Sequence, residues 1–525
     1  MRKAVGSIPT APTFTLKQKR PPEERSLHIR KAVWPKVPVG YPIPTGRIIS
    51  LLISRDLMTK KYALGFTSLE QEVTLDSIEI VGIFPDWLTG SLLRAGPAKF
   101  EVGEHQIEHW FDGFAMLHKF SFKHGNVSYA NKFLQSNFYR NALKQGSVRT
   151  RGFATDPCRS IFKRFTSLFS ANSYDNGNVN VTMLANKFLA LTETPLAVEF
   201  DANTLETFGI FDFHDAIGTH TTTAHPHIDF TTGESFNYSL SFGRNSLYQI
   251  YRIPRNSSER ACIAKIPVSL PSYIHSFAIT EHYIMLAAYP FQVNPLHLLF
   301  SSKSFIENFK WLPENGTRVF VVSRADGSVR EFVAPPIFCF HHVNAYEQGQ
   351  EIILDLVSYK DASIIKALYL DVLRNNFAEK FSLSRLERIS INLANGAVTS
   401  KILSSISPEL PRINYARNNM KPYTYAYAVG QDRDEFLNKL LKINVNTGDA
   451  LVWQEEGCYP SEPVFVEKPG ASSEDEGVIL SVVLDTKNQN SFLLMLDAQT
   501  FTPLGRAIIP HHIPFGFHGN HYNNI

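Results

Sequence analysis

Four histidines, spread over nearly three hundred positions, could share one metal ion. They are His225 in Ala-His-Pro-His, His275 in Ser-Tyr-Ile-His-Ser-Phe, His341 in Cys-Phe-His-His-Val-Asn and His518 in Pro-Phe-Gly-Phe-His-Gly. Imidazole is a ligand for iron, zinc, copper and nickel, so these residue types do not name the metal. A structural zinc ion prefers a closed tetrahedral site. Four imidazoles on one side of an octahedral ion instead leave two positions open for reactants, which favours a ferrous centre that uses dioxygen.

Three glutamates are candidates for an outer shell around this centre. Four neutral imidazoles leave the charge of a divalent ion unneutralised, and a metal-bound histidine usually donates its other N–H to a carboxylate or a carbonyl. Glu193, Glu409 and Glu462 are predicted to take this role. The chain has 18 histidines in all, and the four above differ from the rest in sharing one place in a repeated pattern.

The repeated pattern is a strand, a tight polar turn, a second strand and then a loop with a metal-type residue before a further strand. The turns at 201–204, 324–327, 446–449 and 497–500 precede His225, His341, Glu462 and His518 respectively. Irregular repeats of this kind in a chain of 525 residues predict an all-β fold, a β-propeller. Equivalent positions on successive blades of a propeller face one axis, so residues far apart in sequence can meet there.

Composition permits a large core and gives no case for a nucleic-acid partner. Hydrophobic residues make up 44% of the chain, and there are 39 phenylalanines, which suits an apolar interior or an apolar ligand tunnel. The net charge is only +3, and the basic excess is confined to residues 1–57, with 11 Lys/Arg against 3 Asp/Glu.

Residues 1–57 also contain eight prolines and show no stable periodicity. We expect a disordered or non-native N-terminal extension, which either is a targeting segment or precedes a natural start at Met58. Residues 58–525 are predicted to form a single propeller domain.

The four cysteines form no C-x-x-C pair, so a thiolate zinc site is not expected and a cytoplasmic setting fits best. No apolar run reaches the roughly 20 residues of a membrane span.

Two apolar segments with flanking cations suggest contact with a membrane surface at the entrance for an apolar substrate. The first has Ile161, Phe162, Phe165, Leu168 and Phe169 at helical spacing; the second contains Leu298, Leu299 and Phe300. The alternative for the first segment is a surface helix packed on the core.

In combination, eight motifs make the chain from about residue 75 resemble the carotenoid cleavage oxygenase family. That family includes β-carotene and apocarotenoid dioxygenases, stilbene-cleaving oxygenases and the retinoid isomerohydrolase. The motifs are Gly-Ser-Leu-Leu-Arg-Ala-Gly-Pro (90–97), His-Trp-Phe-Asp-Gly (109–113), Thr-Glu-Thr (192–194), Ala-His-Pro-His (224–227), Ser-Tyr-Ile-His-Ser-Phe (272–277), Phe-His-His-Val-Asn-Ala-Tyr-Glu (340–347), Tyr-Pro-Ser-Glu-Pro (459–463) and Gly-Phe-His-Gly (516–519).

The resemblance implies a seven-bladed propeller with a small helical cap over the face that contains the metal site. It implies Fe(2+) as cofactor, dioxygen as co-substrate, and His225, His275, His341 and His518 as ligands. The three glutamates fall on the family's outer-shell carboxylates. Thr192 matches a threonine whose methyl group crowds one open position on the iron.

The function implied is oxidative cleavage of a conjugated double bond in an apolar polyene, such as a carotenoid or a retinal-yielding apocarotenoid, with peripheral membrane contact and no obligate protein partner. A retinoid ester isomerohydrolase and a stilbene-cleaving oxygenase are the alternatives on the same scaffold. A propeller that acts only as a binding platform is a further alternative, and the complete histidine set speaks against it.

Overall fold

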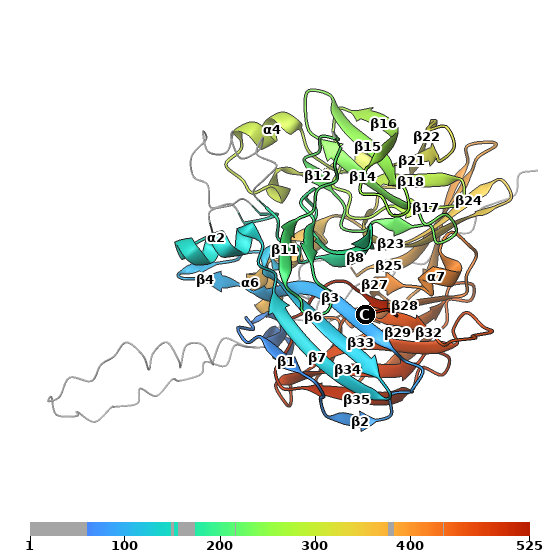
Figure 1. Ribbon diagram of the computed structural model, residues 1–525. Helices are drawn as coiled ribbons and strands as arrows, with labels where there is room; N and C mark the ends of the chain where they lie inside the picture. Colours follow the sequence, from blue (N-terminus) through green and yellow to red (C-terminus); the bar gives the residue numbers. More distant parts are fainter. Residues whose placement is uncertain (1–59, 149–151, 156–173, 216, 376–382, 434) are drawn as a thin grey trace, which may run out of the picture. The chain divides into compact units, whose positions relative to one another are not determined.

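The computed structural model describes residues 60–525 except 149–151, 156–173, 216, 376–382 and 434 (Figure 1). All of these belong to one compact unit, Arg55–Ile525. The predictions for residues 1–57 and for the apolar segment at 161–169 fall outside the described residues. The domain boundary at residue 58 likewise stays a prediction.

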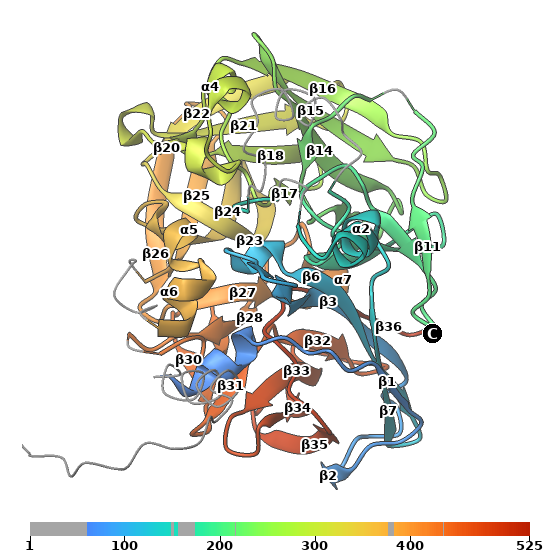
Figure 2. The same ribbon diagram turned by 90° about the vertical axis from the view of Figure 1, so that its left-hand side faces the viewer.

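The described residues form seven antiparallel sheets, the blades of a propeller, which follow one another around an axis in chain order (Figure 2). The prediction of a seven-bladed, all-β propeller is confirmed. The first three blades, in hydrogen-bonding order, are as follows. Blade 1 is β1 (Val73–Leu75), β7 (Asn126–Phe133), β6 (Phe114–Lys123), β3 (Gly90–Lys99) and β36 (Gly519–Tyr522); blade 2 is β11 (Thr207–Ile210), β10 (Val198–Phe200), β9 (Lys187–Leu191) and β8 (Asn180–Leu184); blade 3 is β12 (Thr221–Thr222), β14 (Ser235–Ser241), β15 (Ser246–Ile253) and β16 (Ala261–Val268), with β13 (His227–Ile228) also on β14.

The remaining four blades have the same antiparallel order. Blade 4 is β17 (Ala278–Ile279), β18 (Tyr283–Ala288), β21 (Thr317–Ser323) and β22 (Val329–Ala334); blade 5 is β23 (Phe338–Gln348), β24 (Glu351–Tyr359), β25 (Arg385–Asn392) and β26 (Val398–Ser404); blade 6 is β27 (Pro408–Arg412), β28 (Tyr425–Gly430), β29 (Lys439–Asn444) and β30 (Ala450–Trp453); blade 7 is β2 (Ile80–Gly82), β35 (Pro503–Ile509), β34 (Asn490–Asp497), β33 (Gly477–Asp485) and β31 (Cys458–Pro460), with β32 (Val464–Glu467) also on β33. Two small hairpins, β4 (Glu101–Val102) with β5 (His105–Gln106) and β19 (Phe291–Gln292) with β20 (Lys310–Trp311), lie outside the blades.

Strands from opposite ends of the described chain close the ring. The last strand, β36, pairs with β3 of blade 1, while the early strand β2 pairs with β35 of blade 7. Each end of the chain therefore completes a blade that the other end began, which leaves few open sheet edges at the junction.

The predicted polar turns are the outer hairpins of the blades. Asp201 accepts hydrogen bonds from the backbone N–H groups of the residues two and three positions further on. Asn444 and Asp497 accept the same pair of bonds in blades 6 and 7. The side-chain oxygen stabilises the tight turn, which explains why the same Asp/Asn signal recurs in the sequence.

A blade packs between its two neighbours, so its inner strands are buried on both faces. Such strands appear in the sequence as continuous apolar runs. The strand β33 is buried at every position but its last. The largest buried cluster extends from Tyr62 and Phe66 near the start of the described chain to Phe515 and Phe517 near its end.

Short helices lie over one face of the propeller, the face toward the viewer in Figure 2. They are α2 (Asn137–Gln145), α4 (Pro295–Phe300), α5 (Ser363–Ala367) and α6 (Leu370–Asn375). The described residues also form α7 (Tyr415–Asn418) and the 3-10 turns η1 (Lys61–Phe66), η2 (Trp110–Asp112), η3 (Ile306–Asn308) and η4 (Pro313–Asn315). Among the residues that the structure describes, no helix combines the length and the hydropathy needed to cross a bilayer.

Gly519→Ala is expected to destabilise the closure of blade 1. A Cβ at this position would lie 2.6 Å from the backbone oxygen of Leu93 and would also overlap the Arg94 side chain. Forcing a methyl group into such a contact costs about 1–3 kcal/mol of unfolding free energy. Denaturant unfolding measures this loss. Gly218→Ala is the matched control because a Cβ there meets nothing within 4 Å. Equal stability of the two variants would contradict the close packing of β36 on β3.

Candidate metal centre

The four predicted histidines meet at the axis of the propeller. His225 lies in the loop between β12 and β13, His275 lies three residues before β17, and His518 directly precedes β36. One candidate ligand atom from each of the four, His341 included, lies within 4.8 Å of those of the other three. The Nε2 atoms of His225 and His275 are 3.0 Å apart, and those of His341 and His518 are 3.2 Å apart.

His341 differs from the predicted pattern because it lies inside a strand, β23, rather than in a loop before one. The pairing of β23 with β24 shifts register between Cys339 and His342. A bulge re-aims the side chains at the extra residue. His341 faces the other three histidines, whereas His342 hydrogen-bonds Ser276 and Tyr289 instead.

Three of the histidines donate their Nδ1–H to the three predicted glutamates. The Nδ1–Oε distances are 2.6 Å for His275 to Glu193, 2.7 Å for His341 to Glu409 and 2.8 Å for His518 to Glu462. These bonds fix the orientation and tautomer of each ring, so its Nε2 lone pair faces the centre of the cluster. No carboxylate partner of His225 is found in the described part of the chain.

Each glutamate is itself held by a second group. The Tyr273 hydroxyl donates to Glu193 over 2.8 Å, and the Tyr359 hydroxyl donates to Glu409 over 2.6 Å. Glu462 accepts the backbone N–H of Gly519 over 2.9 Å and lies 3.4 Å from the Arg412 guanidinium. The carboxylates are therefore placed before any ion binds.

Burial favours the neutral form of His225 and His518, whereas neighbouring charges keep Glu462 ionised. Burial lowers the pKa of His225 well below its usual value, with the neighbouring imidazoles acting in the same direction, and it lowers the pKa of His518 to about 4. Burial would raise the pKa of Glu462, but Arg412 and His518 outweigh it and bring the pKa to about 2. Neutral imidazoles with free lone pairs are what metal binding requires.

The donor set fits a divalent first-row metal ion. Four imidazole nitrogens converge, three carboxylates stand behind them to balance the charge, and the Nε2 pairs at 3.0 and 3.2 Å are spaced for a shared ion. Imidazole donors of this kind suit iron, copper, nickel and zinc.

A cavity of about 350 Å³ opens beside the histidines, with His275, His341 and His518 in its wall. This volume lies in the ordinary range for small-molecule sites. Thr192 also lines the cavity and is buried. Residues of α5, α4 and blade 3 also line the cavity.

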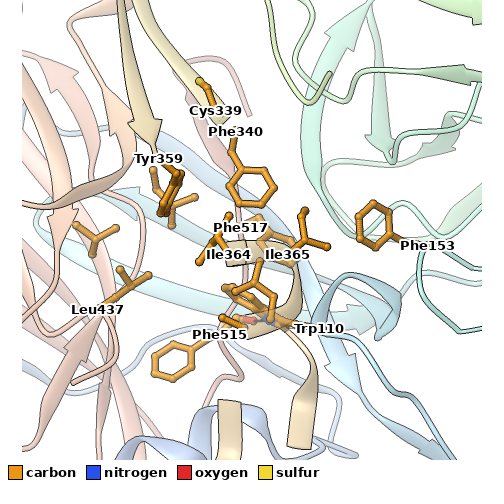
Figure 3. Close-up of a cluster of buried hydrophobic side chains, with 14 of the residues drawn as sticks. Trp110, Phe153, Cys339, Phe340, Tyr359, Ile364, Ile365, Leu437, Phe515 and Phe517 are labelled. Carbon is orange, nitrogen blue, oxygen red and sulfur yellow. Dashed lines mark hydrogen bonds between the residues drawn. The ribbon is translucent and has the colours of Figure 1, made fainter. Parts of the chain in front are cut away.

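Aromatic side chains that the sequence analysis did not assign form much of this cavity wall. Phe340 and Phe517 lie near the middle of the apolar cluster in Figure 3, with Phe153 on one side and Leu437 on the other. The ring of Phe111 lies 6.1 Å from that of His275 and 5.1 Å from that of Phe517. Phe340 and Phe517 directly neighbour His341 and His518 in sequence, a signal that could have predicted their place.

Asp112 anchors the backbone of residues 153–155 at the cavity wall. Its buried carboxylate accepts the backbone N–H groups of Phe153, Ala154 and Thr155 at 2.6–2.8 Å, and the Tyr174 hydroxyl at 3.1 Å. Burial raises the pKa of Asp112, while the three N–H donors oppose that shift. The motif His-Trp-Phe-Asp-Gly at 109–113 therefore contributes both a cavity wall, through Phe111, and the anchor for Phe153.

Asp112→Asn is expected to lower stability by roughly 3 kcal/mol, because an amide offers one acceptor oxygen where two served four donors. Thermal and denaturant unfolding would measure the change. Asp86→Asn, at an exposed carboxylate, is the matched control and is expected to change stability by less than about 0.5 kcal/mol. Similar stability of both variants would show that the 153–155 segment does not depend on Asp112.

The residues of the predicted membrane patch that the structure describes lie on different faces of α4, and membrane contact stays a prediction. Leu298 was expected on the patch, but it is 2% exposed and lines the cavity. The reason is the helical turn of α4, which places Leu296 and Phe300 on the outer face, 57% and 73% exposed, and Leu298 on the inner one. The side chain of Leu299 and residues 161–169 lie outside the described part.

Comparison with known proteins agrees with this architecture. A family profile described as retinal pigment epithelial membrane protein, RPE65, matches residues 66–523. The chain belongs to this RPE65/carotenoid oxygenase family. The resemblance noted in the sequence is thus confirmed.

The names of several relatives of this chain state a reaction. The chain is 34% identical to the mitochondrial carotenoid-cleaving dioxygenase of Mustela putorius furo, covering 86% of this chain and 95% of that one. It is 33% identical to the β,β-carotene 15,15'-dioxygenase of Mus musculus, covering 84% and 88%. The Synechocystis apocarotenoid oxygenase, in a variant form, has a similar structure, with a TM-score of 0.79, 25% identity and coverage of 87% and 98%. This carotenoid oxygenase is accordingly an enzyme of the dioxygenase class.

Proposed function

We propose that this carotenoid oxygenase is an iron(II)-dependent dioxygenase that cleaves a conjugated double bond of a carotenoid or apocarotenoid to aldehyde or ketone products. The observation that supports it most directly is the opening of a four-histidine cluster onto an apolar, aromatic-lined cavity. The relatives named as carotenoid-cleaving and β,β-carotene dioxygenases favour the same reaction.

His225, His275, His341 and His518 would hold the iron, which supplies the binding and activation of dioxygen when it is present. The glutamates keep three of these rings in one orientation and one tautomer. Thr192, in the cavity wall beside Glu193, would limit access to one side of the centre. A solved structure of the Synechocystis relative contains cobalt in substitution, which supports a metal site in that protein.

The chain's own residues would bind the polyene and exclude water. Phe111, Phe153, Phe340 and Phe517 offer flat apolar faces along the cavity, which suit a conjugated chain. The register of the polyene against these rings would decide which double bond lies at the histidine cluster. The proposal requires no proton donor or base from the protein.

We also propose that the enzyme takes its substrate from a membrane surface. Leu296 and Phe300 project from α4 into solvent, and Leu296 also lines the cavity. An exposed apolar pair at a cavity entrance is suited to insertion among lipid headgroups.

Aerobic incubation of the iron-loaded protein with β-carotene and apocarotenals tests the reaction. Cleavage with labelled dioxygen is expected to place labelled oxygen in the aldehyde or ketone products, read by mass spectrometry. Intact substrate across a broad polyene panel would contradict the proposal. Turnover of a retinoid ester without consumption of dioxygen would instead identify the isomerohydrolase alternative.

A further inference from the structure

The cavity wall contains a buried amide without a partner. Gln431, which directly follows β28 in blade 6, is 9% exposed and lines the cavity. Its Nε2 has no hydrogen-bond partner among the residues that the structure describes. Buried polar side chains are nearly always hydrogen-bonded, so an unpaired amide in a ligand cavity calls for an explanation.

Three tyrosine hydroxyls of the same cavity are already paired. The Tyr273 hydroxyl donates to Glu193, and the Tyr174 hydroxyl donates to Asp112. The hydroxyl of Tyr238 donates to the backbone oxygen of Ile274. These groups are therefore occupied by the protein, whereas the amide of Gln431 is available to a ligand.

Gln431 lines the cavity from the blade 6 side. It shares its part of the wall with Leu410 and Leu437 of blade 6, and Leu437 lies on the opposite side of Phe340 and Phe517 from Phe153 (Figure 3). Leu240 of blade 3 and Leu296 of α4 line the other side. Blades 3 and 6 lie on nearly opposite sides of the ring (Figure 2). Three histidines of the cluster line the cavity to which both blades contribute. A linear ligand that passes the histidines would bring its leading end to Gln431.

We propose that Gln431 binds an oxygen atom at the leading end of the substrate, so that the enzyme prefers polyenes with a terminal carbonyl or hydroxyl group over pure hydrocarbons. The inference rests on the proposed function and adds the substrate class to it. The amide N–H would donate to the ligand oxygen and fix how far the polyene advances past the histidines. A hydrocarbon end would leave this amide buried and unpaired, and a site built to form a hydrogen bond discriminates against ligands that cannot form it.

The test measures the binding of polyene probes to the iron-loaded full chain with dioxygen excluded. Binding is read from the quenching of protein fluorescence, since Trp110 lies in the cavity wall. The probes are β-carotene, its ring-hydroxylated analogue zeaxanthin, and an apocarotenal with a chain-end aldehyde. The wild-type protein is expected to bind one or both oxygen-bearing probes roughly 5- to 10-fold more tightly than β-carotene, the range of one hydrogen bond. Preference for zeaxanthin alone would assign a ring hydroxyl, and preference for the apocarotenal alone would assign the aldehyde.

Gln431→Met, which keeps the length of the side chain without its amide, is expected to reduce this affinity ratio to near one. Gln71→Met, at an exposed glutamine, is the matched control and should keep the wild-type ratio. Gln431→Leu gives the same answer if the methionine variant does not fold. Equal affinity for all three probes in the wild type, or a ratio unchanged in the Gln431 variants, would overturn the inference and indicate that water satisfies the amide. Failure of every polyene to bind would count against the proposed function instead.

Discussion

His275→Ala is expected to abolish metal binding and polyene cleavage together. The variant removes one of the four converging nitrogens and leaves Glu193 with a vacant hydrogen-bonding position, because this carboxylate accepts the His275 Nδ1–H over 2.6 Å. Loss of an outer-shell partner typically costs 10- to 100-fold in metal affinity or activity. Loss of a ligand itself should therefore exceed about 100-fold in kcat/KM, with iron content after reconstitution falling in parallel.

His214→Ala is the matched control for this experiment. His214 has a side chain that is 68% exposed and pairs with the similarly exposed Asp212, so its removal should leave iron content and turnover near the wild-type values. Elemental analysis and product formation measure the two quantities separately. A His275→Ala enzyme with full iron content and full turnover would exclude His275 as a ligand.

Glu462→Gln is expected to weaken both the metal centre and the fold. Glu462 is 0% exposed and is the carboxylate partner of His518, and it lies near the positive charges of Arg412 and the buried Arg94. The variant would orient His518 poorly, with a 10- to 100-fold loss of metal affinity or activity. It would also leave buried positive charge without its counter-charge, and breaking a buried pair in this way costs roughly 3–5 kcal/mol.

The two effects of Glu462→Gln can be separated by measurement. Metal affinity is read from iron retention under competition with a chelator, and stability from denaturant unfolding of the metal-free protein. Glu206→Gln is the matched control: Glu206 is 61% exposed in its pair with Lys132, so it should change stability by less than about 1 kcal/mol. If Glu462→Gln retained iron and stability like the control, the carboxylate would have no part in holding His518.

The repeat pattern and the chemistry of the centre could be predicted from the sequence because both depend on local signals. Asp201, Asn444 and Asp497 each form their turn with residues two and three positions away, so the outer hairpins are visible in short stretches. His225 and His518 follow two of these hairpins, at 201–204 and 497–500, and equivalent positions on the blades of a ring face one axis.

Contacts between distant segments were decided only by the tertiary structure. The partnership of Glu193 with His275 joins blades 2 and 4, and that of Glu462 with His518 joins blades 7 and 1; no local pattern specifies either pair. The bulge that aims His341 inward depends on the register of β23 with β24. Leu298 lies inside rather than on the surface because α4 is packed on the cavity by one face.

The sequence alone determined which residue types could bind a metal and how often the strands recur, since both are set within a few residues. The pairing of charges, the inward face of a helix and the unpaired amide of Gln431 depend on packing between blades, and packing is a property of the closed ring.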